Sequence, residues 1–308
     1  MRVELTGAER ARLRGLVDRL STNGASGALL AAPHGRSRVA QDAIARAHGI
    51  PPGDAQFCAD PASGAVWIEV RPPREDPGRT GLADQFLRAI DDFAVGDLDL
   101  EVEPPALARL SAKVDAGGPF LVGERHGVEQ NPLVAYTLMR RFGLRVLALE
   151  WAADLRPVID RFLAGGALDV VRLADSADGR ITAGHFAVLR ALHRDGTLDR
   201  VVLFDPVPWP GTWSERDRDM AARVLRETGH ATALVMAGSL HTRLRRHRHG
   251  EPMGAHLAHA RSGAVEVRLR YPGEPPPTGR AGVCLLRSAG AWLELTVPDA
   301  RQALTPAG

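Results

Sequence analysis

The stretch PFLVGERHGVEQNPLVAYTLMRRFGLRVLALEW, residues 119–151, reads as a strand, a helix and a second strand. Its two ends, PFLVGE and LRVLALE, are continuous apolar runs that stop at polar residues, a pattern typical of strands covered on both faces. Between them, residues 131–142 place apolar side chains at helical spacing and stop at Gly143. This order predicts a βαβ unit and therefore a parallel sheet.

The same alternation continues toward the C-terminus. Further strand-like and helical runs lie at 155–163, 182–193, 200–206, 214–228, 232–241 and 264–271. Residues 281–287 and 292–297 are expected to finish the sheet, with 292–297 as an edge strand. We therefore predict an α/β domain over residues 113–308, built on a mainly parallel sheet that is flanked by helices.

Residues 1–112 predict a small N-terminal α/β region. Apolar residues recur at helical spacing in 6–20, 37–48 and 81–93, whereas 65–73 and 97–105 have the pattern of strands. This region contains no group of residues that indicates a chemistry, so its role stays open.

Composition limits the classes of function. The 308 residues carry a formal net charge of +2, which is too weakly basic for a dedicated nucleic-acid binder. Cys58 and Cys284 lie far apart, so neither a disulfide framework nor a cysteine zinc site is expected. The N-terminus does not resemble a secretion signal, and no apolar run is long enough for a membrane helix. We expect a soluble cytoplasmic protein without nucleic-acid or membrane partners, and its oligomeric state stays open.

Polar residues follow four of the predicted strands at the point where each strand ends. They are Glu124, Arg125 and His126, then Glu150, then Asp205, and finally His241. A charge placed directly after a buried strand is costly unless it is hydrogen-bonded, paired or bound to a metal. Because parallel strands end at the same edge of a sheet, these side chains are expected to converge there.

These residue types indicate acid–base or metal chemistry. An imidazole beside a carboxylate suits a general base that activates water. Alternatively, His126, His241, Glu124 and Glu150 form a set that could bind a divalent transition metal such as Mn, Co or Zn. Each residue taken alone also has a structural interpretation: the histidines could begin helices, and Glu150 or Asp205 could cap the helix that follows.

The chain resembles the erythromycin esterase/ChaN-like superfamily, which includes the Tiki and TraB-type proteins. The resemblance covers residues 121–271, and its carriers are GERH (123–126), ALEW (148–151), RDRDMA (216–221), AGSLH (237–241) and PMGAHL (252–257). It implies that His126 is the water-activating base, with Glu150 as its carboxylate partner and His241 as a second imidazole. It also implies that Arg216 orients an anionic or carbonyl group, and Glu124 joins this catalytic set.

The resemblance implies a hydrolase that cleaves an ester, amide or related bond in a small-molecule or peptide substrate. Tiki-like members imply a metal-dependent peptidase. ChaN-like members imply haem binding without turnover, although Tyr136 is expected to pack on its own helix and not to bind iron. A lyase-type biosynthetic enzyme that uses the same histidine pair for proton transfer is a further alternative, as is a non-catalytic interaction protein.

Further residues are candidates for substrate binding. Arg125 and Asp205 lie at the strand ends, and Trp209 and Trp213 lie in a proline-rich loop that is either a lid or a packed connection. Arg243 belongs to the basic stretch 241–250, which could bind a phosphate, a carboxylate or an acidic peptide, or could be a solvated helix end. No serine-hydrolase elbow or P-loop is present.

Overall fold

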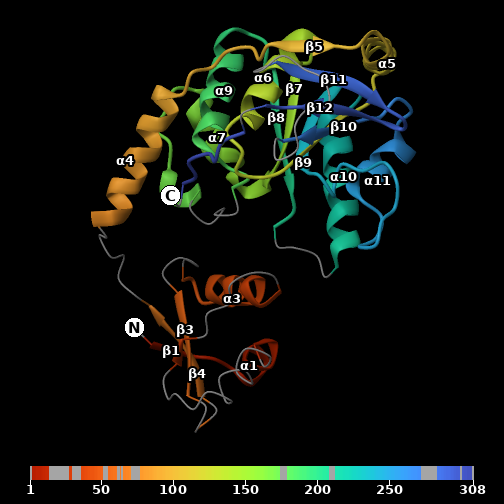
Figure 1. Cartoon of the computed structure of the whole chain (residues 1–308). Helices are drawn as coiled ribbons and strands as arrows, with labels where there is room; N and C mark the ends of the chain where they lie inside the picture. The colour runs from red at the N-terminus through yellow and green to blue at the C-terminus, as the bar shows by residue number, and fades with distance from the viewer. Residues whose placement is uncertain are drawn as a thin grey trace. The chain divides into compact units, whose positions relative to one another are not determined.

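The computed structural model divides the chain into two compact units, Met1–Arg79 and Thr80–Gly308 (Figure 1). The structure describes residues 2–13, 28–29, 36–50, 55–60, 63, 65–70, 77–173, 179–207, 212–271, 283–298 and 300–306. None of the helices in these ranges is long and apolar enough to cross a membrane.

The first unit is a small antiparallel sheet with helices. Its elements are β1 (Arg2–Glu4), α1 (Gly7–Arg12), β2 (Ala28–Leu29), α3 (Arg36–Ala47), β3 (Ala55–Asp60) and β4 (Ala65–Val70), and its strand order is β1-β4-β3-β2. Thr6 begins α1 because its side chain accepts a hydrogen bond from the backbone N–H of Glu9. Leu13, Ile44 and Phe57 are buried in its core.

The second unit contains the eight-stranded sheet that positions the candidate site. Its strands are β5 (Leu100–Val102), β6 (Phe120–Glu124), β7 (Val146–Ala152), β8 (Arg200–Asp205), β9 (Ala233–Gly238), β10 (Val265–Arg270), β11 (Cys284–Ala289) and β12 (Trp292–Thr296). Their order is β5-β11-β12-β10-β6-β9-β7-β8, and every neighbouring pair is parallel except β11 with β12. The predicted α/β class with a mainly parallel sheet flanked by helices is confirmed.

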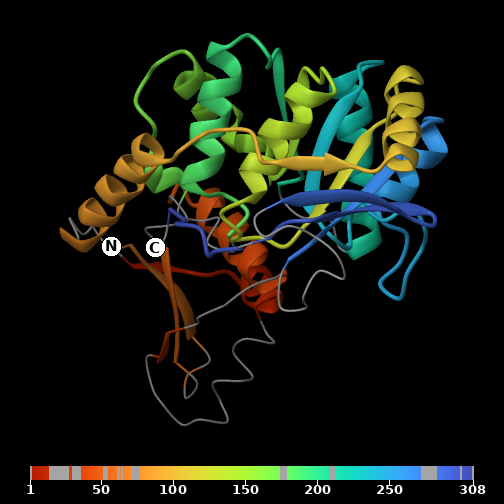
Figure 2. The same ribbon diagram turned by 45° about the horizontal axis from the view of Figure 1, so that its top comes forward.

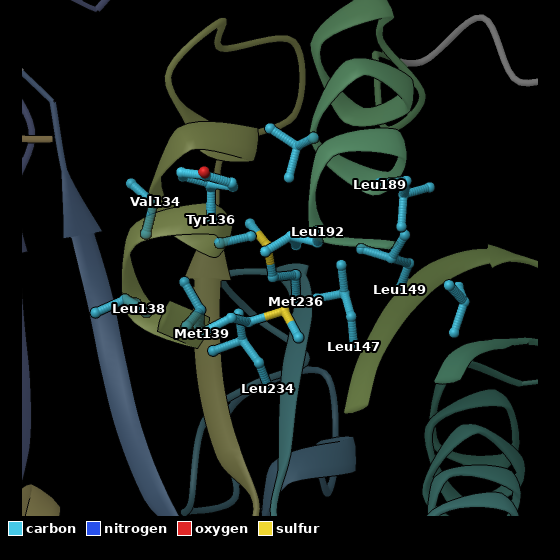
Figure 3. Packing of buried hydrophobic residues seen from close by; sticks show 14 of the residues in the cluster. Val134, Tyr136, Leu138, Met139, Leu147, Leu149, Leu189, Leu192, Leu234 and Met236 are labelled. Atoms are coloured by element: carbon cyan, nitrogen blue, oxygen red, sulfur yellow. The ribbon is translucent and has the colours of Figure 1, made fainter. Parts of the chain in front are cut away.

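Helices cover both faces of this sheet (Figure 1). They are α4 (Pro77–Asp92), α5 (Pro104–Asp115), α6 (Asn131–Arg141), the short η2 (Ala153–Leu155), α7 (Arg156–Leu163), α8 (Val170–Leu173), α9 (Ala183–Arg194), α10 (Trp213–Thr228) and α11 (Met253–Ala260). On one face, Leu147 of β7 and Met236 of β9 pack against α6 and α9 (Figure 3). On the other, their sequence neighbours Ala148 and Val235 pack with residues of α10 and α11, as the two-residue period of a strand requires.

Tyr136 lies in the first of these two layers. It is buried in the core on α6 (Figure 3), and its hydroxyl accepts a hydrogen bond from Arg140 at 2.8 Å. The packed role expected for this tyrosine is confirmed.

The division between the units comes earlier than the predicted boundary at 112/113. Strand β5 is hydrogen-bonded to β11 and therefore belongs to the large sheet; in Figure 2 it runs alongside the blue strands. Phe86 of α4 and Leu110 of α5 are buried in the core of that same sheet. The prolines at 104 and 105 begin α5, since proline lacks only an N–H that the first helical turn leaves unpaired.

The position of β12 also differs from the prediction. Residues 292–297 were expected to form an edge strand, but β12 lies between β10 and β11, and Leu293 and Leu295 are buried. The edges of the sheet are β5 and β8. The apolar alternation of β12 therefore reflects burial on one face of an interior strand.

Candidate functional site

His126 follows β6, and its side chain is hydrogen-bonded to Glu124, the last residue of that strand. Its Nδ1 atom lies 2.9 Å from Oε1 of Glu124. Because a carboxylate only accepts hydrogen bonds, Nδ1 carries a proton, and in the neutral ring the lone pair is on Nε2. Among the described residues none is hydrogen-bonded to Nε2, and Oε2 of Glu150 lies 3.9 Å from it. Glu124, and not the expected Glu150, is therefore the carboxylate that orients His126.

The surroundings of His126 favour its protonated form. Burial by itself lowers the pKa of His126, but the hydrogen bond to Glu124 and the negative charges of Glu124 and Glu150 outweigh it. The pKa therefore lies above its ordinary value. Burial lowers the pKa of another histidine in this unit, His185, to about 4, so His185 is neutral at pH 7.

Glu150 is held from two directions at the end of β7. Its Oε1 accepts a hydrogen bond from Nη2 of Arg216 at 2.7 Å, and its Oε2 accepts one from the backbone N–H of Gly238 at 2.7 Å. Burial by itself raises the pKa of Glu150, but the positive charges around it, among them those of Arg180 and Arg216, lower it well below its ordinary value. Glu150 is therefore a fixed negative charge.

Two arginines join Glu150 to the end of β8. Asp205 accepts hydrogen bonds from Nε of Arg216 at 2.8 Å and from Nη1 of Arg180 at 2.7 Å. Arg180 also lies 3.4 Å from Oε1 of Glu150. Arg216 and Asp205 are each only 4% exposed. Arg216 and Asp205 therefore bind each other in this structure, and the substrate contacts expected of them stay a prediction.

His241 uses both of its ring nitrogens within the protein. Nδ1 donates to Oδ1 of Asp217 at 2.7 Å, and Nε2 accepts from Nη1 of Arg216 at 3.1 Å. The other oxygen of Asp217 accepts from the backbone N–H of Met253 at the start of α11. The ring of Trp213 stacks on His241 with centroids 5.0 Å apart. His241 is therefore held in one orientation without a free lone pair.

Gly238 lies where these groups meet. A Cβ atom at this position would lie 3.3 Å from Nε2 of His126 and 3.5 Å from Oε2 of Glu150. The glycine of the motif AGSLH (237–241) therefore has a physical explanation: it leaves space between His126 and Glu150, and its N–H fixes the carboxylate of Glu150.

A cavity of about 400 Å³ opens beside His126. Its walls come from the 125–128 loop, from Gly179 and from the 300–305 segment. Gly127 and Gly179 have φ angles of 78° and 82°, and a Cβ on Gly179 would lie 2.9 Å from the backbone nitrogen of Gly127. Only glycine fits this contact, which brings the two backbones together at the wall of the cavity.

The four residues expected to bind a metal do not fit that role. Within the part of the chain that the structure describes, no three His, Cys, Asp or Glu side chains are grouped so that they could hold a metal ion. Glu150 and His241 already accept N–H groups of Gly238 and Arg216, and the guanidinium brings positive charge to the place of the cation. As hydrogen-bonded in this structure, the four side chains therefore do not form the donor set that Mn, Co or Zn would need.

The remaining predicted residues lie in different places. Arg125 lines the cavity, with its guanidinium 4.8 Å from the centroid of the Tyr271 ring. Trp213 packs on His241 as the first residue of α10, whereas Trp209 lies outside the described residues. Arg243 is half-buried, and its Nε atom has no hydrogen-bond partner among the described residues.

Sequence reasoning missed three members of the site. Asp217 orients His241, and its only signal was its place beside Arg216 in the motif RDRDMA. Arg180 pairs with Asp205 and Glu150, but it lies in a connection before α9 where no pattern singles it out. Tyr271 follows β10, and its hydroxyl accepts the backbone N–H of Arg125 and donates to Asn131.

The fold and the site define an α/β protein with an oriented histidine–glutamate pair at the carboxyl edge of its parallel strands. No protein-family model, no curated protein and no solved structure matches the chain.

Proposed function

We propose that this protein is a hydrolase that cleaves an ester, amide or related bond with water activated by His126. One observation carries the proposal: His126 is oriented by Glu124 through Nδ1, its Nε2 accepts no hydrogen bond from a described residue, and it lines a cavity. The resemblance of GERH (123–126) and AGSLH (237–241) to motifs of the erythromycin esterase/ChaN-like superfamily supports the same class of reaction.

In the proposed reaction, Nε2 of His126 accepts a proton from water while the water oxygen bonds to the carbonyl carbon of the substrate. Glu124 stabilises the resulting imidazolium through Nδ1. The imidazolium then returns the proton to the leaving alkoxide or amine as its bond to carbon breaks. No step requires a metal ion.

Glu150 acts on this pair through charge and position. It lies 3.9 Å from Nε2 of His126, and its negative charge raises the pKa of the imidazole. Arg216 and the N–H of Gly238 hold the carboxylate in place. Glu150, Arg216 and His241 are therefore positioning residues.

Replacement of His126 tests the proposal. Wild-type protein, His126→Gln and the exposed control His230→Gln are incubated with 4-nitrophenyl esters and amino-acid 4-nitroanilides in H₂¹⁸O. We expect His126→Gln to lose about 10²-fold or more in rate, the usual contribution of a general base, with an unchanged circular dichroism spectrum. Full activity of the folded His126→Gln variant would remove His126 as the base.

The isotope separates hydrolysis from the lyase alternative. Hydrolysis places one ¹⁸O atom from water in the acid product, whereas proton abstraction from carbon followed by elimination leaves the product unlabelled. The same base could serve either reaction, so an unlabelled product formed only by proteins that retain His126 would favour the lyase.

The pH profile identifies the base independently. His126 must be neutral to accept a proton, so kcat/KM should fall at low pH as His126 becomes protonated. Because the pKa of His126 is raised, the midpoint of this fall should lie above the ordinary imidazole value of 6.5. Glu124→Gln removes the negative charge and leaves burial as the largest influence, which lowers the pKa. In Glu124→Gln we expect the midpoint of the low-pH fall in kcat/KM to move to lower pH, while the maximal rate decreases. A midpoint that does not move would contradict the role of His126.

A further inference from the structure

We infer that the cavity beside His126 binds a small organic anion, through Arg125 and Arg301 at its walls. The inference rests on the proposed function, because it assigns the anion to the substrate. Two arginines, Arg125 and Arg301, line this space of about 400 Å³ together with His126 and Gln302. Among the described residues that line it, none is an aspartate or a glutamate.

The two carboxylates beside His126 do not cancel this positive charge. Glu124 is bonded to His126, and Glu150 is compensated by Arg216 and Arg180. Both carboxylates are buried, at 5% and 3% exposed, whereas the Arg125 and Arg301 side chains are exposed. An anion that enters the cavity therefore meets the guanidinium groups first.

Arg301 is held at the cavity by the backbone around it. Its carbonyl accepts the N–H of Glu129 at 2.9 Å, and its own N–H donates to Oε1 of Gln130 at 3.0 Å. The N–H of Ala303 donates to the carbonyl of Gly127 at 2.8 Å. The backbone of segment 300–305 is thereby fixed along the loop that carries His126, which keeps Arg301 at the wall of the cavity.

Arg125 is held by a different set of contacts. Its guanidinium lies over the ring of Tyr271, and the hydroxyl of that ring donates to Asn131 at 2.6 Å. Arg125 also follows Glu124 and precedes His126 directly, so it cannot move far from the base. An anionic group held here would place a neighbouring bond of the same molecule close to Nε2 of His126.

Size and chemistry define the ligand class. A cavity of this volume is at the small end of the range for small-molecule sites. Arginine side chains recognise planar carboxylates and phosphates through paired N–H donors. We therefore assign the substrate as a small molecule with a carboxylate or a phosphate group beside its scissile bond.

Calorimetric titration with succinate, inorganic phosphate and uncharged succinamide tests the inference without turnover. The proteins are the wild type, Arg301→Gln, Arg125→Gln and the control Arg218→Gln, an exposed arginine on α10. We expect the wild type to bind at least one anion but not succinamide. Loss of a charge-assisted bond should raise Kd about tenfold or more in the first two variants, with no change in the control.

The outcomes separate the ligand chemistries and the two proposals. Preference for succinate indicates a carboxylate, and preference for phosphate a phosphate group. A wild type that binds neither anion, or an affinity unchanged in both pocket variants, would overturn the inference; Arg301→Gln alone is decisive if Arg125→Gln does not fold. His126→Gln should still bind the anion. A wild type that binds the anion but hydrolyses none of the esters or amides would overturn the hydrolase and leave the anion site standing.

Discussion

Arg216→Met should destabilise the second unit by about 3 kcal/mol. Arg216 is 4% exposed and donates to Glu150, Asp205 and His241. Removal of one partner from a buried ion pair costs about 3–5 kcal/mol, because an uncompensated charge remains. Arg180 still contacts both carboxylates, so the lower end of that range applies.

Urea denaturation followed by tryptophan fluorescence measures this loss. The variants are made with Trp67→Phe, because the other four of the five tryptophans then all belong to the second unit. Arg218→Met is the matched control, since this exposed arginine lies on the same helix, and a surface change of this kind usually alters the free energy of unfolding by less than about 0.5 kcal/mol.

Two results would refute this reasoning. Equal destabilisation by Arg216→Met and Arg218→Met would mean that the buried ion pairs contribute nothing measurable. Strict additivity of Arg216→Met and Asp205→Asn in a double-mutant cycle would also refute it, because Arg216 and Asp205 are in direct contact.

Two other substitutions test the centre of the site. Glu150 has a folded-state pKa below its ordinary value of 4.5, so its contribution to stability is complete above pH 4.5 and is lost as the pH falls below that value. Glu150→Gln should therefore make the free energy of unfolding decrease less steeply on the acid side. An unchanged slope of the free energy of unfolding against pH would contradict this. Gly238→Ala should lower kcat/KM severalfold, because the added Cβ would lie 3.3 Å from Nε2 of His126 and shift the base by a few tenths of an ångström. Gly96→Ala, whose Cβ would meet nothing within 4 Å, should leave kcat/KM unchanged. Similar rates for the two alanine variants would show that the space at Gly238 is not needed.

The convergence of polar residues at one edge of the sheet could be predicted from the sequence. Apolar runs define the strands, and parallel strands end together, so Glu124, Glu150 and Asp205 had to lie at the same edge. The partner of each group could not be predicted in this way. His126 is hydrogen-bonded to Glu124 and not to Glu150. Which of the two carboxylates it contacts depends on side-chain rotamers, and the sequence pattern does not specify these.

The residues that reach the site from distant segments were also beyond prediction. Arg180 precedes α9 and Arg301 follows β12, and neither position has a periodic pattern that would place it. The same limit applies to the strands: β5 has few residues, and only its hydrogen bonds to β11 assign it to the large sheet. The local pattern of apolar residues identifies a helix or a strand, whereas the strands beside it in a sheet depend on the path of the whole chain.

The pairing of β5 with β11 has a consequence for folding kinetics. Nearly the whole second unit lies between these two strands in the sequence, so their contact closes a very long loop. Strand β11 must also pair with β12, and β12 with β10, before β5 has a fixed edge to join. Contacts of such high sequence separation slow folding, and β5 is therefore the strand expected to dock last.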